Sequence, residues 1–173
     1  MRRVIIGCAV ILGLVSCTAT KSTTSARATQ KAIKAEETRM AVESMVQSGS
    51  YLVKVDRLYS GRVSNAYLSP NQNYIIIDKG QLRMKLAYMG RSYNLRGIAA
   101  INMSANAEKY EVVRDTAKKK FDVRIKASQA GEPFDIFLTI DDSGYANVSV
   151  TNPRIETVRY YGKLALTTAQ SGS

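Results

Sequence analysis

The chain has 173 residues and a formal net charge of +11, from 25 lysines and arginines against 14 aspartates and glutamates, and it contains no histidine. Hydrophobic residues make up 45% of it, which excludes an intrinsically disordered chain, and its length fits one domain with a short appendage. The lack of histidine excludes Ser-His-Asp and Cys-His catalysis and histidine-ligated zinc. The basic charge favours anionic partners, although a charged, solvated surface is the simpler explanation.

The N-terminus has the parts of an exported protein. A basic start, MRR, precedes twelve apolar residues, Val4 to Val15. A helix of that length is too short to cross a bilayer of about 30 Å and fits a secretory signal. The order Leu14-Val15-Ser16-Cys17 resembles the bacterial lipobox, whose cysteine is acylated and begins the mature protein. We therefore expect residues 1–16 to be a lipoprotein signal peptide and Cys17 to be the lipidation site.

Acylation of Cys17 has consequences for chemistry and location. Several acyl chains attach a protein durably to a membrane. Because Cys8 leaves with the signal, the mature chain keeps no thiol for a disulfide, a nucleophile or a thiolate metal site. Thr18 does not resemble an inner-membrane retention signal, so we expect the periplasmic face of the outer membrane. Residues 17–27 are small and hydroxylated and predict a flexible tether.

Residues 28–47 predict a helix. They are rich in Ala, Glu, Lys and Met and contain neither Gly nor Pro, and Gly49 follows as a cap. An apolar stripe at helical spacing consists of Ala28, Ala32, Ala35, Val42, Met45 and Val46. We expect the stripe to dock on the rest of the domain, with binding of a separate partner as the alternative.

From Tyr51 onward the period of the apolar residues changes to two. In FDVRIKA, for example, Phe121, Val123 and Ile125 alternate with charged residues. The candidate strands are residues 51–58, 73–78, 82–88, 97–104, 110–113, 121–127, 134–140, 145–150 and 157–166.

Turn residues separate several of these strands. They lie in DKGQ around Gly80, QAGEP around Gly131 and DDSG at residues 141–144. The pattern predicts a mainly β fold, an antiparallel meander of about eight or nine strands forming a sandwich or a barrel. We expect one globular domain over residues 28–168, with its β-domain at 51–168 and a flexible tail at 169–173.

Recognised catalytic and metal-binding motifs are missing from the sequence. It has no Gly-rich phosphate loop and no Ser-x-x-Lys, so we expect no cofactor and no metal. Asp141 and Asp142 are explained by turn formation. Asp122 and Asp135 lie on neighbouring strands, where they form either surface ion pairs or a carboxylate pair of the glycosidase type.

The tyrosines are the candidate binding residues. The chain has ten Tyr, three Phe and no Trp. Aromatic, glycine and basic residues occur together in AYMGRSY and in YYGKL, which form either a stacking platform for a ligand or ordinary core with hydroxyls at the rim. The candidate ligand-binding residues are Tyr88, Arg91, Tyr93, Tyr161 and Lys163.

AYMGRSY, the SGSYLVKVDR segment at 48–57 and the closing GYANVSVTNPRIETVRYYGKLAL resemble landmarks of a Bacteroidetes lipoprotein family, the domain of unknown function 4251. The resemblance extends over about residues 32–166. It differs at Met89, where an aromatic residue is more usual, and in the short NLRGIAA after Tyr93. It implies an envelope location and a single-domain fold, and it assigns no activity and no site residues.

The function we expect is a non-catalytic binding or scaffold module, anchored to the membrane through acyl chains on Cys17. The candidate partners are an anionic envelope polymer or another envelope protein, and export makes nucleic acid unsuitable. The alternatives are a carboxylate-based hydrolase of envelope polymers and a carrier of a lipophilic ligand.

Overall fold

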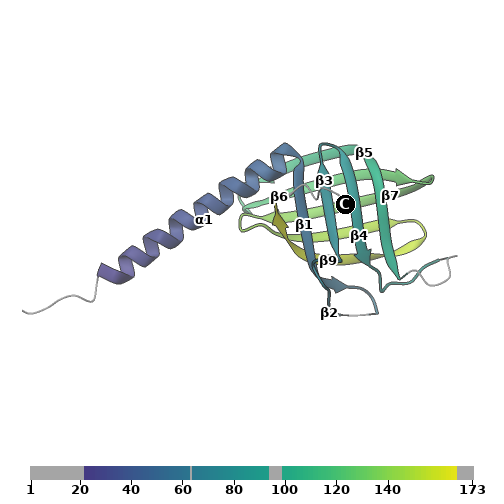
Figure 1. Cartoon of the computed structure of the whole chain (residues 1–173), viewed down its shortest axis with the longest axis horizontal. Helices are drawn as coiled ribbons and strands as arrows, with labels where there is room; N and C mark the ends of the chain where they lie inside the picture. The colour runs from purple at the N-terminus through teal and green to yellow at the C-terminus, as the bar shows by residue number, and fades with distance from the viewer. Residues whose placement is uncertain (1–21, 63, 94–98, 167–173) are drawn as a thin grey trace, which may run out of the picture. The chain divides into compact units, whose positions relative to one another are not determined.

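The computed structural model describes residues 22–62, 64–93 and 99–166 and shows a mainly β protein with one helix (Figure 1). Cys17 and the predicted signal peptide lie outside the described residues, as does the predicted tail. The elements are α1 (Ser22–Ser48), β1 (Ser50–Tyr59), β2 (Ala66–Tyr67), β3 (Tyr74–Asp78), β4 (Gln81–Ala87), β5 (Ala100–Asp115), β6 (Lys120–Gln129), β7 (Glu132–Asp141), β8 (Tyr145–Asn152) and β9 (Ile155–Ala165).

All nine strands belong to one antiparallel sheet in the order β2-β1-β3-β4-β5-β6-β7-β8-β9. Because β1 also pairs with β9, the strands β1 and β3 to β9 close into an eight-stranded barrel, and β2 is a short addition beside β1. In Figure 1 the early strands, in teal, and the late strands, in green to yellow, form two walls that cross. The predicted antiparallel β fold is confirmed, and of the two expected architectures the barrel is the one that forms.

The core lies inside the barrel and follows the alternation of the sequence. On β6 the side chains of Phe121, Val123 and Ile125 are buried while those of Arg124 and Lys126 are exposed. Inward side chains of the other barrel strands join the same hydrophobic cluster. Burial of these side chains is the main stabilising contribution, since each removes most of its apolar surface from water.

The β5 strand differs from the prediction of two strands at 97–104 and 110–113. Its first half pairs with β4 up to Asn106, and its second half pairs with β6 from Ala107. The register shifts between Ala107 and Lys109, so Glu108 is an extra residue that bends the strand. One long bent strand thus joins the two walls, and the polar stretch that interrupts the alternation marks the bend rather than a loop.

The helix also begins earlier than predicted. It starts at Ser22 instead of Ala28, so residues 22–27, predicted as tether, are helical, because nothing from Ser22 to Ser48 breaks a helix. The chain falls into two compact units, Met1–Lys34 and Ala35–Ser173. The described part of α1 is not apolar enough to cross a membrane.

Within the second unit, the last turns of α1 pack on the barrel as the docking prediction states. Val42 and Val46 are buried in the core and Met45 is partly buried, whereas Ala35 of the same predicted stripe is exposed. The Tyr110 hydroxyl donates a hydrogen bond to the carbonyl oxygen of Val46 at 2.9 Å. The helix is therefore held by both apolar contact and a polar contact at its end.

Closure of the barrel requires a glycine at position 162. The β1–β9 register shifts between Val55 and Arg57, which makes Asp56 a bulged residue opposite this part of β9. A Cβ atom on Gly162 would lie 2.3 Å from the carbonyl oxygen of Lys54 and 3.0 Å from the Cα of Val55. Both are backbone atoms, so no side-chain rotation relieves the overlap. The Gly in YYGKL thus serves the β1–β9 seam.

Substitution Gly162→Ala is expected to lower the free energy of unfolding by about 2–4 kcal/mol, because the two backbones must separate at the seam. Denaturant titration followed by circular dichroism measures the change. The control Arg159→Ala, at an exposed position of the same strand, should change it by less than about 0.5 kcal/mol. Equal denaturation midpoints for Gly162→Ala and Arg159→Ala would contradict the close approach of β1 and β9.

Candidate functional site

The AYMGRSY segment is organised around a buried tyrosine. The Tyr88 side chain is 4% exposed, and its hydroxyl lies within hydrogen-bond distance of the carbonyl oxygens of Arg91 and Glu156. A Cβ on Gly90 would lie 2.5 Å from this hydroxyl oxygen, so a larger residue there would force the buried ring to shift. Tyr88 is a core residue that shapes the segment, which agrees with the core interpretation of the tyrosines and removes its ring from a ligand-binding surface.

Glu156, at the start of β9, holds this segment in place. Its carboxylate accepts hydrogen bonds from the backbone N–H groups of Gly61 at 3.1 Å and Arg91 at 2.9 Å. The N–H of Tyr93 donates to the carbonyl oxygen of Arg154 at 2.7 Å. The side chains of Arg91 and Tyr93 are exposed beside this region. Their backbones therefore have a structural role, and only their side chains are free to meet a ligand.

Tyr161 and Lys163 lie elsewhere, on the outer face of β9, in a row of four side chains. The rings of Tyr161 and Tyr145 are stacked with centroids 5.5 Å apart and an interplanar angle of 14°. The Arg57 guanidinium carbon lies 4.4 Å from the centroid of Tyr161, and the Lys163 Nζ lies 4.9 Å from that of Tyr145. We call these four residues the cation–tyrosine row. Each ring is already in contact with the other ring and with a cation, so the row presents fixed cations and ring edges rather than open ring faces.

The register of three strands produces this row. Arg57 of β1 lies opposite Tyr161, and Tyr145 of β8 lies opposite Lys163. Such cross-strand neighbours on one face are within contact distance. Partial burial raises the pKa of the Tyr161 phenol, while the Arg57 charge acts in the opposite direction. Arg57 and Tyr145 were not among the predicted site residues, since their proximity depends on barrel closure and on the register of the β8–β9 hairpin.

The predicted site residues thus form two groups. Tyr88, Arg91 and Tyr93 lie around Glu156, whereas Tyr161 and Lys163 lie at least five residues further along β9. At about 3.3 Å per residue this separates Glu156 from Tyr161 by about 17 Å. The five residues do not make one compact site, and the second group gains Arg57 and Tyr145.

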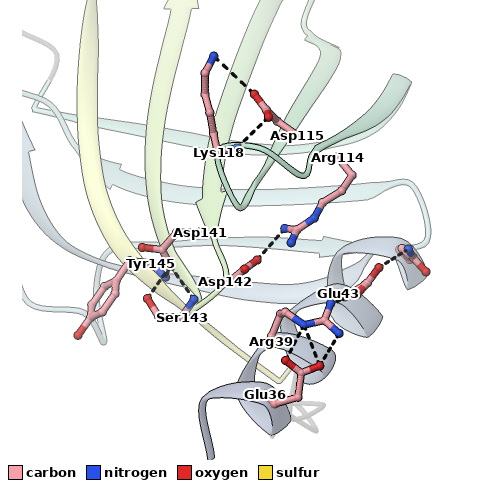
Figure 2. A network of polar contacts seen from close by, with 11 residues as sticks. Glu36, Arg39, Glu43, Arg114, Asp115, Lys118, Asp141, Asp142, Ser143 and Tyr145 are labelled. Atoms are coloured by element: carbon pink, nitrogen blue, oxygen red, sulfur yellow. Dashed lines mark hydrogen bonds and ion pairs between the residues drawn. The ribbon is translucent and has the colours of Figure 1, made fainter. Parts of the chain in front are cut away.

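The adjacent carboxylates Asp141 and Asp142 have different partners, as Figure 2 shows. Asp141 Oδ1 accepts hydrogen bonds from the Ser143 N–H and hydroxyl at 2.9 and 2.6 Å and from the Tyr145 N–H at 3.0 Å. Asp142 forms an ion pair with Arg114 at 2.7 Å. Asp141 therefore organises the β7–β8 turn, as predicted, and Asp142 connects that turn to β5.

The other carboxylate pair, Asp122 and Asp135, is also divided between separate partners. Asp122 contacts Lys120 at 2.9 Å and Thr139 at 3.0 Å, and Asp135 forms an ion pair with Lys126 at 3.6 Å. In the register of β6 and β7 the two aspartates face these residues and not each other. Among the described residues there is no group of three or more acidic or cysteine side chains that could hold a metal ion.

A pocket of about 230 Å³ opens where the first half of β5 diverges from β6. Its lining residues come from β5, the β6–β7 hairpin and the β8–β9 hairpin and include Ile101, Phe134 and Asn152. The Asn152 side chain is 5% exposed, and both its polar atoms are used, by the carbonyl oxygen of Pro133 at 2.8 Å and the N–H of Arg154 at 2.8 Å. The pocket offers apolar contact but no free buried polar group from Asn152.

Comparison with known proteins places the chain in a family. Residues 33–164 match the family described as a domain of unknown function (DUF4251). The chain belongs to the DUF4251 family. This confirms the resemblance found in AYMGRSY and YYGKL, and the glycines of both motifs now have structural explanations in Gly90 and Gly162.

A crystal structure of a DUF4251 family protein from Bacteroides eggerthii DSM 20697, at 1.95 Å resolution, is similar to this chain. Its TM-score is 0.62 at 14% sequence identity, over 75% of this chain and 87% of the other. At that identity the likeness supports the fold and not a function. No curated protein matches the chain.

Five of the ten tyrosines, Tyr51, Tyr88, Tyr110, Tyr160 and Tyr161, carry hydroxyls whose pKa is raised by full or partial burial. The folded state therefore retains these protons at a pH where the unfolded chain, with tyrosine pKa values near 10, releases them. A group whose pKa is raised by folding contributes full stability below the unfolded value, and this contribution falls as pH rises above it.

Stability is expected to fall steadily above about pH 10, with phenolate absorbance of the buried tyrosines appearing in the same transition as loss of the circular dichroism signal. Alkaline titration followed by both signals checks this. Tyr160→Phe should reduce the pH dependence of the unfolding free energy above about pH 10, because it removes one buried hydroxyl. Phenolate formation by all ten tyrosines in the intact fold would contradict the burial argument.

Proposed function

We propose that this DUF4251 protein is a lipid-anchored envelope lipoprotein whose barrel is a non-catalytic binding module. The anchor part of the proposal rests on the order of basic residues, apolar run and Leu14-Val15-Ser16-Cys17 at the N-terminus. The acylated Cys17 would hold the protein at the periplasmic face of the outer membrane. The barrel would then be presented beyond the membrane surface.

The observation that carries the binding part is the cation–tyrosine row of Arg57, Tyr161, Tyr145 and Lys163. It lies on the outer face of three strands and combines two ordered cations with two phenols. Arginine and tyrosine are enriched at the centres of binding surfaces, because they offer large contact area together with hydrogen-bond donors. A rigid barrel holds such side chains in one arrangement, which reduces the entropy lost on binding.

The positions of the carboxylates support binding over hydrolysis. A glycosidase of the usual kind needs two carboxyl groups that face each other across a substrate site. Asp141 and Asp142 instead have a turn and Arg114 as partners, and Asp122 and Asp135 have Lys120 and Lys126. The carboxylates of α1 shown in Figure 2 are paired as well. Glu36 and Glu43 both contact Arg39, and the hydrogen bond with Arg39 lowers the pKa of Glu36.

The anchoring part is tested by Cys17→Ala in the organism's own envelope. We expect the variant to lose metabolic incorporation of labelled fatty acid and to move from the membrane fraction to the soluble fraction. Cys8→Ala is the matched control, since it removes the other cysteine of the chain from within the apolar run. Persistent labelling and membrane attachment of Cys17→Ala would overturn the lipobox interpretation.

The binding part is tested by incubating the purified full chain with separated envelope polysaccharide and protein fractions. A fraction that contains the ligand is expected to raise the thermal midpoint, because a ligand of the folded state stabilises it by mass action. Lys163→Ala should weaken this shift more than Arg91→Ala, since Arg91 lies outside the cation–tyrosine row. The size distribution of the polymer should be unchanged after incubation.

Each alternative has its own result in this experiment. Shortened polymer chains would favour the hydrolase, and lipid extracted from the purified protein would favour the carrier, for which the pocket beside Ile101 and Phe134 is the relevant feature. If no fraction shifts the midpoint, the proposal of a binding module fails.

A further inference from the structure

The outer face of β1, β9 and β8 has an excess of positive charge. Its cations are Lys54, Arg57, Arg159 and Lys163, and with the two tyrosines of the row they form what we call the basic face. Two carboxylates are near this face: Asp56, at the β1 bulge, contacts Arg57 at 3.5 Å, and Asp141 accepts a hydrogen bond from the Tyr145 N–H at 3.0 Å. All 14 acidic side chains of the sequence lie within the described residues. None of them forms an ion pair with Lys54, Arg159 or Lys163.

Two of these cations oppose each other directly. Lys54 of β1 is the cross-strand neighbour of Lys163 of β9, and both side chains are exposed. Like charges at directly opposed positions destabilise a sheet. On β5 and β6, Lys109 and Lys126 also oppose each other, but each has a carboxylate partner, Glu111 for Lys109 and Asp135 for Lys126. The basic face therefore carries an electrostatic cost that an anionic ligand would relieve.

The cation–tyrosine row fixes two of the charges. The Arg57 guanidinium packs on Tyr161 and the Lys163 ammonium on Tyr145, so both cations keep contact with a ring while their polar groups stay at the surface. Every second side chain of β9 points outward, and three of these are Arg159, Tyr161 and Lys163. Each is separated from the next by about 7 Å along the strand. A straight row of donors at regular intervals matches an extended chain with repeating negative groups.

We propose that the basic face binds an anionic polysaccharide, with Arg57, Arg159 and Lys163 contacting its acidic groups and the Tyr145 and Tyr161 hydroxyls bonding to its sugar oxygens. This inference rests on the proposed binding function and names the ligand class for its site. A membrane surface is the less suitable occupant, because surface binding to lipid needs apolar side chains that insert below the headgroups. Of the three exposed large apolar side chains on or next to these strands in the described structure, two are tyrosines with polar hydroxyls, Tyr145 and Tyr67 of β2 opposite Arg57, and one is Leu166 after β9.

The test measures binding of the full chain carrying Cys17→Ala, which removes acyl chains from the comparison, to polygalacturonate and to its fully methyl-esterified form. The two polymers share a backbone and differ in charge. We expect the protein to bind polygalacturonate, with affinity that falls as salt is added, and to bind the esterified polymer at least about fivefold more weakly.

The double variant Arg57→Gln/Lys163→Gln should weaken binding to polygalacturonate at least about fivefold, as expected for two surface charge contacts. The matched control is Arg124→Gln/Lys126→Gln on β6, which removes the same charge from another outer face and should change affinity less than about twofold. The comparison separates a defined site from general attraction to a basic protein.

Three further variants cover folding and positioning. Arg159→Gln removes an exposed cation that packs on neither ring of the row, so it should weaken binding with an unchanged thermal midpoint even if the double variant does not fold. Tyr145→Phe keeps the stacked ring and Tyr145→Ala removes it while all charges stay. We expect the alanine variant to bind more weakly than the phenylalanine variant, because Lys163 loses the ring that holds it.

The outcomes are distinct. Equal losses in the Arg57/Lys163 and Arg124/Lys126 variants, or equal binding of charged and esterified polymer, would overturn the assignment of the site. Binding to phosphatidylglycerol vesicles but not to polygalacturonate, lost in the Arg57/Lys163 variant, would overturn it in favour of a membrane surface. If the protein does not bind polygalacturonate but an envelope fraction still raises its thermal midpoint, this inference fails and the proposed binding function stands.

Discussion

The pairing of β1 with β9 is the contact on which the rest of the structure depends. It turns a meander of nine strands into a closed barrel and leaves β2 as a short addition. The pairing requires a residue without a side chain at position 162. The β1 strand bulges at Asp56, and its backbone lies where a Cβ atom at position 162 would have to be. Closure also removes the free strand edges that would otherwise pair with other chains.

Closure also determines which surface residues meet. Arg57 comes from the first strand of the chain and Tyr161 from the last, and they are neighbours only because those strands pair. The β8–β9 hairpin then adds Tyr145 beside Tyr161. The same glycine that permits the seam lies between Tyr161 and Lys163. The glycine of YYGKL, a motif in which the chain resembles the family, is therefore explained by folding, and the candidate binding surface forms from the residues around it.

Most of the fold could be predicted from the sequence, but of the cation–tyrosine row only Tyr161 and Lys163 could. The period of two in segments such as 121–127 and 134–140 locates strands well, because inward and outward side chains differ in kind. The alternation carries no information on closure or on the corner at Glu108, where a bend looks like a break in the pattern. Tyr88 and Tyr161 stand in similar motifs, yet one is buried and the other lies on the surface, since the difference depends on which neighbour the chain folds over.

The distribution of charge follows from the same geometry. The strands β5 to β7 carry cations and carboxylates at opposed or nearby positions, as in Lys120 with Asp122 and Lys126 with Asp135. Around the seam, Asp56 is taken into the bulge and Glu156 is used to bind backbone N–H groups, so neither balances the cations of β9. The excess of charge at the basic face is thus a consequence of how the barrel closes, and relief of that excess is what an anionic ligand would contribute to binding.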